Sequence, residues 1–146
     1  MFFDCWNLRD ESCQKVLLIS IRPKWVREIL SGRKTFELRT RPPKLEEPAQ
    51  TLIYESSPTC RIRAVCEMGP VLSGTPRDLW EKICDRACIS RSDYDAYFTG
   101  RDEAHAIEVK DVEELPPVMT LARLRLEADF EPHHNYRWAT EVEDNL

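Results

Sequence analysis

The chain alternates between short stretches with the period of a strand and short stretches with the period of a helix. The apolar run from Val16 to Ile21 predicts a buried strand. Pro23 then suits the first turn of a helix, and Ser31 followed by Gly32 suits its end. Such a helix would bury one face, made of Val26, Ile29 and Leu30. The pattern therefore begins with a strand, a helix and a turn in quick succession.

The segment from Thr35 to Arg41 predicts a second strand, with two unlike faces. The period of two places Phe36, Leu38 and Thr40 on one face. The opposite face carries Thr35, Glu37, Arg39 and Arg41. One carboxylate set among cations on the same face makes this segment the first candidate for a functional site.

Strand alternation returns after a turn-prone stretch at residues 41–50. Strands are predicted at Thr51–Glu55, at Ile62–Val71 and within residues 104–115. The second of these would bury the face made of Ile62, Ala64, Cys66 and Met68. Residues 120–127 fit a short helix or a strand.

Two helices are predicted between these strands from their capping residues. Thr75, followed by Pro76 and by Asp78, is typical of the start of a helix, which would bury Leu79, Trp80, Ile83 and Cys84. Ser90 begins the other helix, which Gly100 would end. Helices inserted irregularly between strands predict an α+β fold, closed as a small mixed β-barrel that the helices flank.

Size and composition are those of one folded domain. The chain has 146 residues, and 42% of them are hydrophobic, which supplies enough apolar surface for a core. The sequence has no apolar run long enough to span a membrane, and acidic residues occur in its first stretch, where a signal peptide needs cations. We therefore expect a cytoplasmic protein with no membrane partner.

Charge is distributed unevenly along the chain. The net charge is −5, yet residues 15–44 contain nine lysines and arginines against two acidic residues, a local net charge of +7. A basic patch on an acidic body can still attract an anionic ligand, because exposed charges act over only about 8 Å at physiological salt. The alternative is a solvated helix face with no partner.

The six cysteines are expected to be free thiols, because the chain lacks the features of a secreted disulfide-rich protein. Cys84 and Cys88 would share one helix face and could bind a metal together with His133 and His134. Two partly buried thiols are the alternative, and we expect no metal and no cofactor. A chain with only four glycines also lacks a glycine-rich phosphate loop.

The stretch ILSGRKTFELR, residues 29–39, resembles the core motif of the ASCH family, a branch of the PUA-like barrels. Further segments occur in the family's order: LIYESSP, then DLWEKICDRACISRSDYDAYFTGRDEAHAIEV, then FEPHHNYRW. The resemblance covers roughly residues 16–138. It implies a β-barrel flanked by helices, preceded by an extension at residues 1–15 and followed by an acidic tail at residues 139–146.

The resemblance also implies a cleft beside this motif and several functions. Family members are similar to RNA-binding domains, and RNA or nucleotide recognition, coactivator-type regulation and hydrolysis have been proposed for them. One branch resembles amidohydrolases that deacylate N4-acetylcytidine with a lysine, a threonine three residues later and a glutamate. Lys34 matches the lysine, but Glu37 occupies the threonine position. Glu67 and Glu81 match the third group by residue type alone.

A binding module is the first of two hypotheses. Cations would contact phosphates, aromatic rings would stack on a base, and the Glu37 carboxylate would accept from an exocyclic amino group. The predicted ligand-binding residues are Lys24, Arg27, Lys34, Glu37, Arg39, Arg41, Tyr54 and Arg63, with Trp25, Tyr97 and Tyr136 as further stacking candidates. Alternatively, Glu37 only pairs with Arg39 or Arg63, and Trp25, Tyr97 and Phe98 pack in the core.

An enzyme is the second hypothesis, either an amidohydrolase or a ribonuclease. Lys34 and Glu37 would be its catalytic residues, and His105, His133 and His134 are candidate acids and bases. We expect the carboxylate beside Lys34 to keep this lysine protonated and therefore a poor nucleophile. The sequence thus favours recognition of RNA, of another single-stranded nucleic acid or of a nucleotide or nucleoside over hydrolysis.

Overall fold

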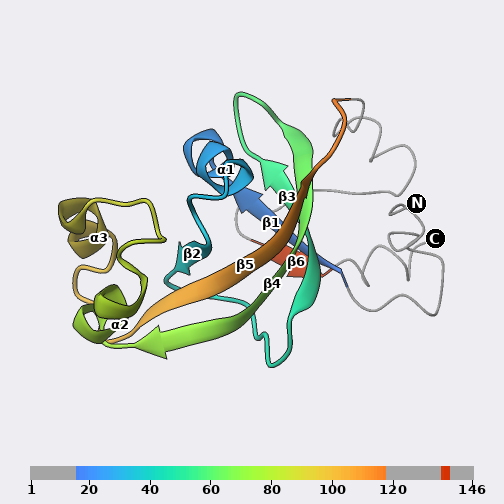
Figure 1. Ribbon diagram of the computed structural model, residues 1–146. Coiled ribbons are helices and arrows are strands. Elements are labelled where there is room, and N and C mark those ends of the chain that lie inside the picture. Colours follow the sequence, from blue (N-terminus) through green and yellow to red (C-terminus); the bar gives the residue numbers. More distant parts are fainter. Residues whose placement is uncertain (1–15, 118–135, 139–146) are drawn as a thin grey trace.

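The computed structural model describes residues 16–117 and the backbone of residues 136–138. Six strands and three helices follow one another in these ranges (Figure 1). They are β1 (Leu17–Ile21), α1 (Pro23–Leu30), β2 (Phe36–Arg39), β3 (Ala49–Glu55), β4 (Arg61–Gly74), α2 (Pro76–Ile83), α3 (Arg91–Tyr97), β5 (Ala104–Glu114) and β6 (Tyr136–Trp138). The predicted segment at residues 120–127 lies outside the described residues.

The strands form one mixed sheet in the order β2-β5-β4-β3-β1-β6. β1 runs parallel to β3, whereas the other neighbouring strands are antiparallel. Irregular register between β4 and β5, on both sides of Glu67, helps the long strands to bend, and Figure 1 shows them as curved ribbons. In the described parts of the chain, β2 and β6 are the end strands, so the sheet is a half-barrel. The predicted α+β fold, a small mixed barrel flanked by helices, is confirmed.

Two hydrophobic clusters hold these layers together. The first lies between α1 and the half-barrel and includes Ile19, Val26, Ile29, Ile53 and Met68, all at most 1% exposed. The second joins β2 and the beginning of β5 to α2 and α3. β2 therefore lies where the barrel meets the helices, and this position brings its side chains to the functional site.

The starts of α2 and α3 agree with the capping prediction, but α3 ends at Tyr97, before the predicted Gly100, and one predicted apolar face is wrong. The hydroxyls of Thr75 and Ser90 accept from the N3 amides of α2 and α3, as expected for N-caps. Cys84 was predicted on the buried face of α2, and this prediction is wrong: the helix ends at Ile83, and Cys84 is exposed. Cys88 follows in a left-handed turn, so the two thiols do not share a helix face.

The predicted strands are present with shifted ends. β2 is shorter than predicted, since Arg41 lies beyond its end and is exposed. β3 and β4 are longer than predicted, and the face with Ile62 and Met68 is buried as expected. None of the helices in the described ranges is long and apolar enough to cross a membrane.

Candidate functional site

A cleft of about 1100 Å³ opens where the half-barrel meets the helical part. Its walls come from the end of β1, from α1, from β2, from the turn between β3 and β4, and from the segment that contains α3. The lining residues are Ser20, Ile21, Arg22, Trp25, Lys34, Glu37, Leu38, Arg39, Tyr54, Ser56, Ser57, Cys60, Ile89, Asp93 and Tyr97. The ILSGRKTFELR motif thus forms one wall of a larger concave surface.

The period of β2 explains why its charged side chains reach this cleft. Phe36 and Leu38 are buried in the cluster with α2 and α3. Glu37 and Arg39 occupy the alternate positions and line the cleft. The predicted division of the strand into an apolar and a charged face is therefore observed over the four residues of β2.

Glu37 and Arg39 form a buried, directional ion pair. Arg39 donates from Nε and Nη2 to Oε2 of Glu37, at 3.0 and 2.7 Å. Nη2 of Arg39 also donates to the backbone oxygen of Ser20 at 2.7 Å, which links β2 to the end of β1. Charge-assisted contacts of this kind fix a carboxylate in one orientation. Of the two pairing partners predicted for Glu37, Arg39 forms this ion pair, whereas Arg63 pairs with Glu55 at 2.9 Å.

Lys34 is buried against the same carboxylate. Its side chain is 3% exposed, and Nζ lies 3.9 Å from Oε1 of Glu37 and donates to the backbone oxygen of Ala87 at 2.8 Å. Burial lowers the pKa of Lys34, and this effect outweighs the opposing influence of Glu37. Glu37 opposes this shift, as predicted, but the larger effect is the desolvation of Lys34, which was not visible in the sequence. Whether Lys34 is protonated stays a prediction.

Three aromatic side chains complete the lining. Trp25 is half-buried, and its ring centroid lies 4.6 Å from Nζ of Lys24 and 4.9 Å from Nζ of Lys34. Tyr54 is buried, whereas Tyr97 is 43% exposed and donates from its hydroxyl to the backbone oxygen of Leu38 at 3.3 Å. Tyr97 also packs on Phe98, so it combines core packing with an accessible ring.

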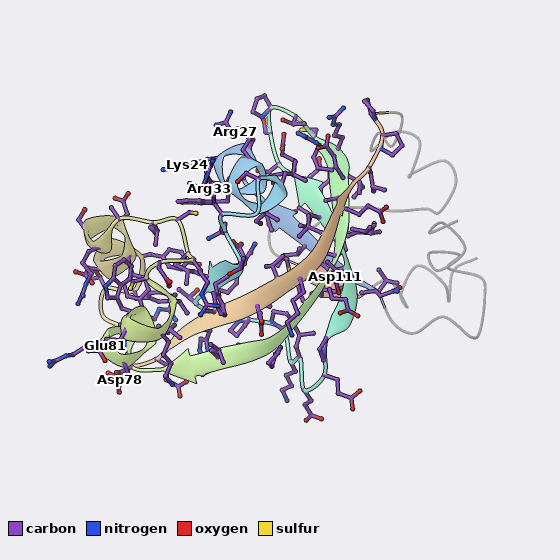
Figure 2. The ribbon with its side chains drawn as sticks, in the orientation of Figure 1. Lys24, Arg27, Arg33, Asp78, Glu81 and Asp111 are labelled. Atoms are coloured by element: carbon purple, nitrogen blue, oxygen red, sulfur yellow. The ribbon has the colours of Figure 1, made fainter. Side chains whose placement is uncertain are left out.

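The predicted ligand-binding residues divide into two groups. Lys34, Glu37, Arg39 and Tyr54 line the cleft. The other four, Lys24, Arg27, Arg41 and Arg63, are not part of its lining. Figure 2 shows Lys24 and Arg27 on α1 and Arg33 near them, just beyond the end of this helix, and all three residues are exposed.

Several lining residues were not predicted. Ser56, Ser57 and Cys60 belong to the turn between β3 and β4, and Asp93 stands in the first turn of α3. Arg22, at the N-cap of α1, is a further lining residue of this kind. The turn residues carried a turn signal and Asp93 a capping signal, but neither pattern indicates that these segments meet at one cleft.

The remaining catalytic candidates do not come together at the cleft in the described ranges. His105 contacts Ser73, with 2.7 Å between Nδ1 and Oγ, and it is not among the lining residues. Glu67 and Glu81 are not among them either, and Figure 2 shows Glu81 beside Asp78 on α2. His133, His134 and the side chain of Tyr136 lie outside the described residues, so the metal hypothesis that includes these histidines stays untested.

Comparisons with known proteins agree on one family. The family model for the ASCH domain matches residues 19–114. A Zymomonas mobilis protein named an ASCH domain-containing ribonuclease is 27% identical over 136 residues, which cover 93% of this chain and 92% of that protein. Ureaplasma parvum large ribosomal subunit protein uL22 is 26% identical over 102 residues, 70% of this chain but 33% of that protein.

Solved structures give the same result. The crystal structure of the ASCH protein from Zymomonas mobilis has a TM-score of 0.77 at 27% identity, covering 90% of this chain and 94% of that one. A tyrosine-to-phenylalanine mutant of the same protein has a TM-score of 0.79 and 27% identity, covering 90% and 95%. The similarity thus extends well beyond the short motif.

Proposed function

This chain belongs to the ASCH domain family, and from that premise we propose that it binds single-stranded RNA and holds one nucleotide in the cleft. The observation that carries the proposal is the Glu37 carboxylate, 6% exposed as a residue and oriented by Arg39. Its Oε2 takes both hydrogen bonds from Arg39, whereas Oε1 lies beyond hydrogen-bond distance from Lys34. Oε1 therefore keeps the capacity to accept from a ligand.

A nucleobase fits this arrangement chemically. The Watson–Crick edge of every base places an N–H donor beside an acceptor, and the cleft offers the acceptor Glu37 beside the donor Lys34. Stacking on an aromatic ring would hold the base plane, and Tyr97 presents an accessible ring at the same cleft. The Zymomonas mobilis relative, which is named a ribonuclease, supports RNA as the nucleic acid.

Replacing the acceptor tests this proposal. Glu37→Gln keeps the shape of the side chain and loses its charge, so a short single-stranded RNA should bind roughly tenfold more weakly, as expected for a lost charged hydrogen bond of about 1.4 kcal/mol. Fluorescence anisotropy with a labelled RNA measures the change. The matched control is Glu108→Gln, which alters a half-buried carboxylate of β5 that is not among the lining residues. Equal affinities for both variants would contradict the proposal.

RNA cleavage is a second candidate function. It is supported by the lowered pKa of Lys34, since a buried amine that releases its proton more readily can act as a base. The name of the Zymomonas mobilis relative points the same way. Cleavage of the bound RNA by the native protein, lost in Lys34→Met, would favour this candidate. Deacylation of N4-acetylcytidine has less support, because Glu67 and Glu81 do not line the cleft.

A further inference from the structure

Two of the cations that line the cleft, Lys34 and Arg39, are engaged by the protein itself. Arg39 donates to Glu37 and to the backbone of Ser20, and Lys34 donates to the backbone of Ala87. Glu37 compensates part of their combined charge within the cleft. These groups are therefore better suited to orient a base than to neutralise phosphates of a polynucleotide.

Exposed cations continue from the rim of the cleft along α1. Arg22 is exposed and lines the cleft at the start of this helix. Lys24 and Arg27 follow on the outer surface, three positions apart and so on adjoining turns. The Lys24 ammonium lies against Trp25, which is itself a lining residue, so the row begins at the cleft. Arg33 is already paired with Glu28 at 2.8 Å and is left out of this row.

The lining residue that the first turn of α3 contributes is negatively charged instead. Asp93 is exposed and lines the cleft from α3. The next acidic residue on that helix, Asp95, is paired with Arg91 at 3.1 Å. A phosphate backbone that left the cleft over α3 would approach Asp93, whereas one that left over α1 would meet Arg22, Lys24 and Arg27. Arg91 on α3 and Glu28 on α1 are each held in an ion pair, with Asp95 and Arg33 respectively. Since close like charges repel and opposite charges attract, the remaining charges favour α1 as the exit.

We infer that the RNA held at the cleft places the phosphates beside its bound nucleotide on the α1 row, made of Arg22, Lys24 and Arg27. This inference rests on the proposed function, because it needs a nucleotide in the cleft. It assigns separate tasks to two parts of the surface: the cleft holds the base, and the α1 row neutralises phosphates. The net charge of −5 leaves the α1 row as a local attractive surface on an otherwise acidic protein.

The salt dependence of RNA affinity separates these tasks. Each phosphate neutralised on a single strand contributes about 0.7 to the slope of log affinity against log salt. The double variant Lys24→Ala/Arg27→Ala should therefore flatten the slope by about 1.4 and weaken binding roughly tenfold at low salt. Tyr97→Leu, which removes a ring but no charge, should weaken binding and leave the slope unchanged. The matched control is Arg77→Ala/Arg101→Ala, which removes two exposed arginines that are not cleft residues.

Each outcome of this experiment is decisive. A slope that flattens in the α1 variant and not in the control supports the inference. An unchanged slope in the α1 variant, or equal flattening in both double variants, overturns it while RNA binding at the cleft still stands if Tyr97→Leu and Glu37→Gln weaken affinity. If the native protein binds no RNA at all, the proposed function fails and this inference fails with it.

Discussion

The buried position of the Lys34 side chain makes its charged form less favourable than in water. The side chain is 3% exposed, and desolvation lowers its pKa from the ordinary value of 10.5. The carboxylate of Glu37 acts in the opposite direction with a smaller effect. An amine in this position is poised to donate to a ligand and also releases its proton more readily than a surface lysine.

This shift predicts a pH dependence of stability. Between the lowered folded pKa and the unfolded value near 10.5, the unfolded chain binds a proton at Lys34 that the folded protein has released. The free energy of unfolding should therefore rise with pH in this window, relative to a variant without the group. Urea unfolding of the native protein and of Lys34→Met, from neutral to alkaline pH, measures the difference. The free energy of unfolding of the native protein should increase relative to that of Lys34→Met as the pH rises.

Lys110→Met is the control for that comparison, because Lys110 is exposed on β5. Its difference from the native protein should stay nearly constant over the same pH range, because this substitution removes no buried side chain. If the difference in free energy of unfolding between the native protein and Lys34→Met falls as the pH rises, the pKa of Lys34 is not lowered by folding.

At the scale of elements, β2 shows which structural features a sequence pattern predicts and which it does not. The alternation in FELR correctly predicts that Glu37 and Arg39 share a face, because strand geometry is local. It does not predict that Arg39 reaches the backbone oxygen of Ser20, 19 positions earlier, because that contact depends on how the half-barrel curves. Periodicity thus identifies the polar face, and tertiary packing decides what that face meets.

The helix caps provide a prediction that separates stability from binding. Thr75 and Ser90 make equivalent hydrogen bonds, accepting from the N3 amides of α2 and α3 at 3.2 and 3.1 Å. Replacing either with alanine should lower the free energy of unfolding by about 1 kcal/mol. Of these two helices, α3 carries lining residues, Asp93 and Tyr97, and α2 carries none, so Ser90→Ala should also weaken RNA binding. Urea unfolding and fluorescence anisotropy on both variants test this pair.

Thr75→Ala is the internal control of that pair. It should reduce stability as much as Ser90→Ala while RNA affinity stays at the native value, because α2 contributes no residue to the cleft lining. Equal losses of affinity in both variants would mean that the caps act through global stability and that the order of α3 is not what positions the site.

At the scale of the whole molecule, the family resemblance implied a cleft beside the motif, but the segments that form its other walls were the least predictable feature. Contacts that shape it join positions far apart in the chain, such as Lys34 with Ala87 and Tyr97 with Leu38, which are 53 and 59 residues apart. Residues with a strong local signal, such as those of the ILSGRKTFELR motif, were found from sequence. Arg22 and Asp93 were not, because their local patterns indicate only the start of a helix.

This architecture leads to a last prediction, on the stability of the complex. RNA in the cleft would touch the end of β1, β2, the turn at residues 56–60 and α3 together, and all of these keep their arrangement only in the folded protein. A ligand that binds only the folded state adds about 2.7 kcal/mol when its concentration is 100 times its dissociation constant. Saturating single-stranded RNA should therefore raise the melting temperature of the native protein.

The same RNA should slow amide hydrogen exchange most in the segments that line the cleft, because a ligand protects the structure that it bridges. Differential scanning fluorimetry and hydrogen exchange on the native protein measure the two effects. At one fixed RNA concentration, Glu37→Gln should show a smaller rise in melting temperature, whereas Glu108→Gln should match the native protein, since Glu108 does not line the cleft. If RNA slowed amide exchange only in α2 and β4, neither of which contributes a lining residue, it would bind on another surface, even if the melting temperature rose.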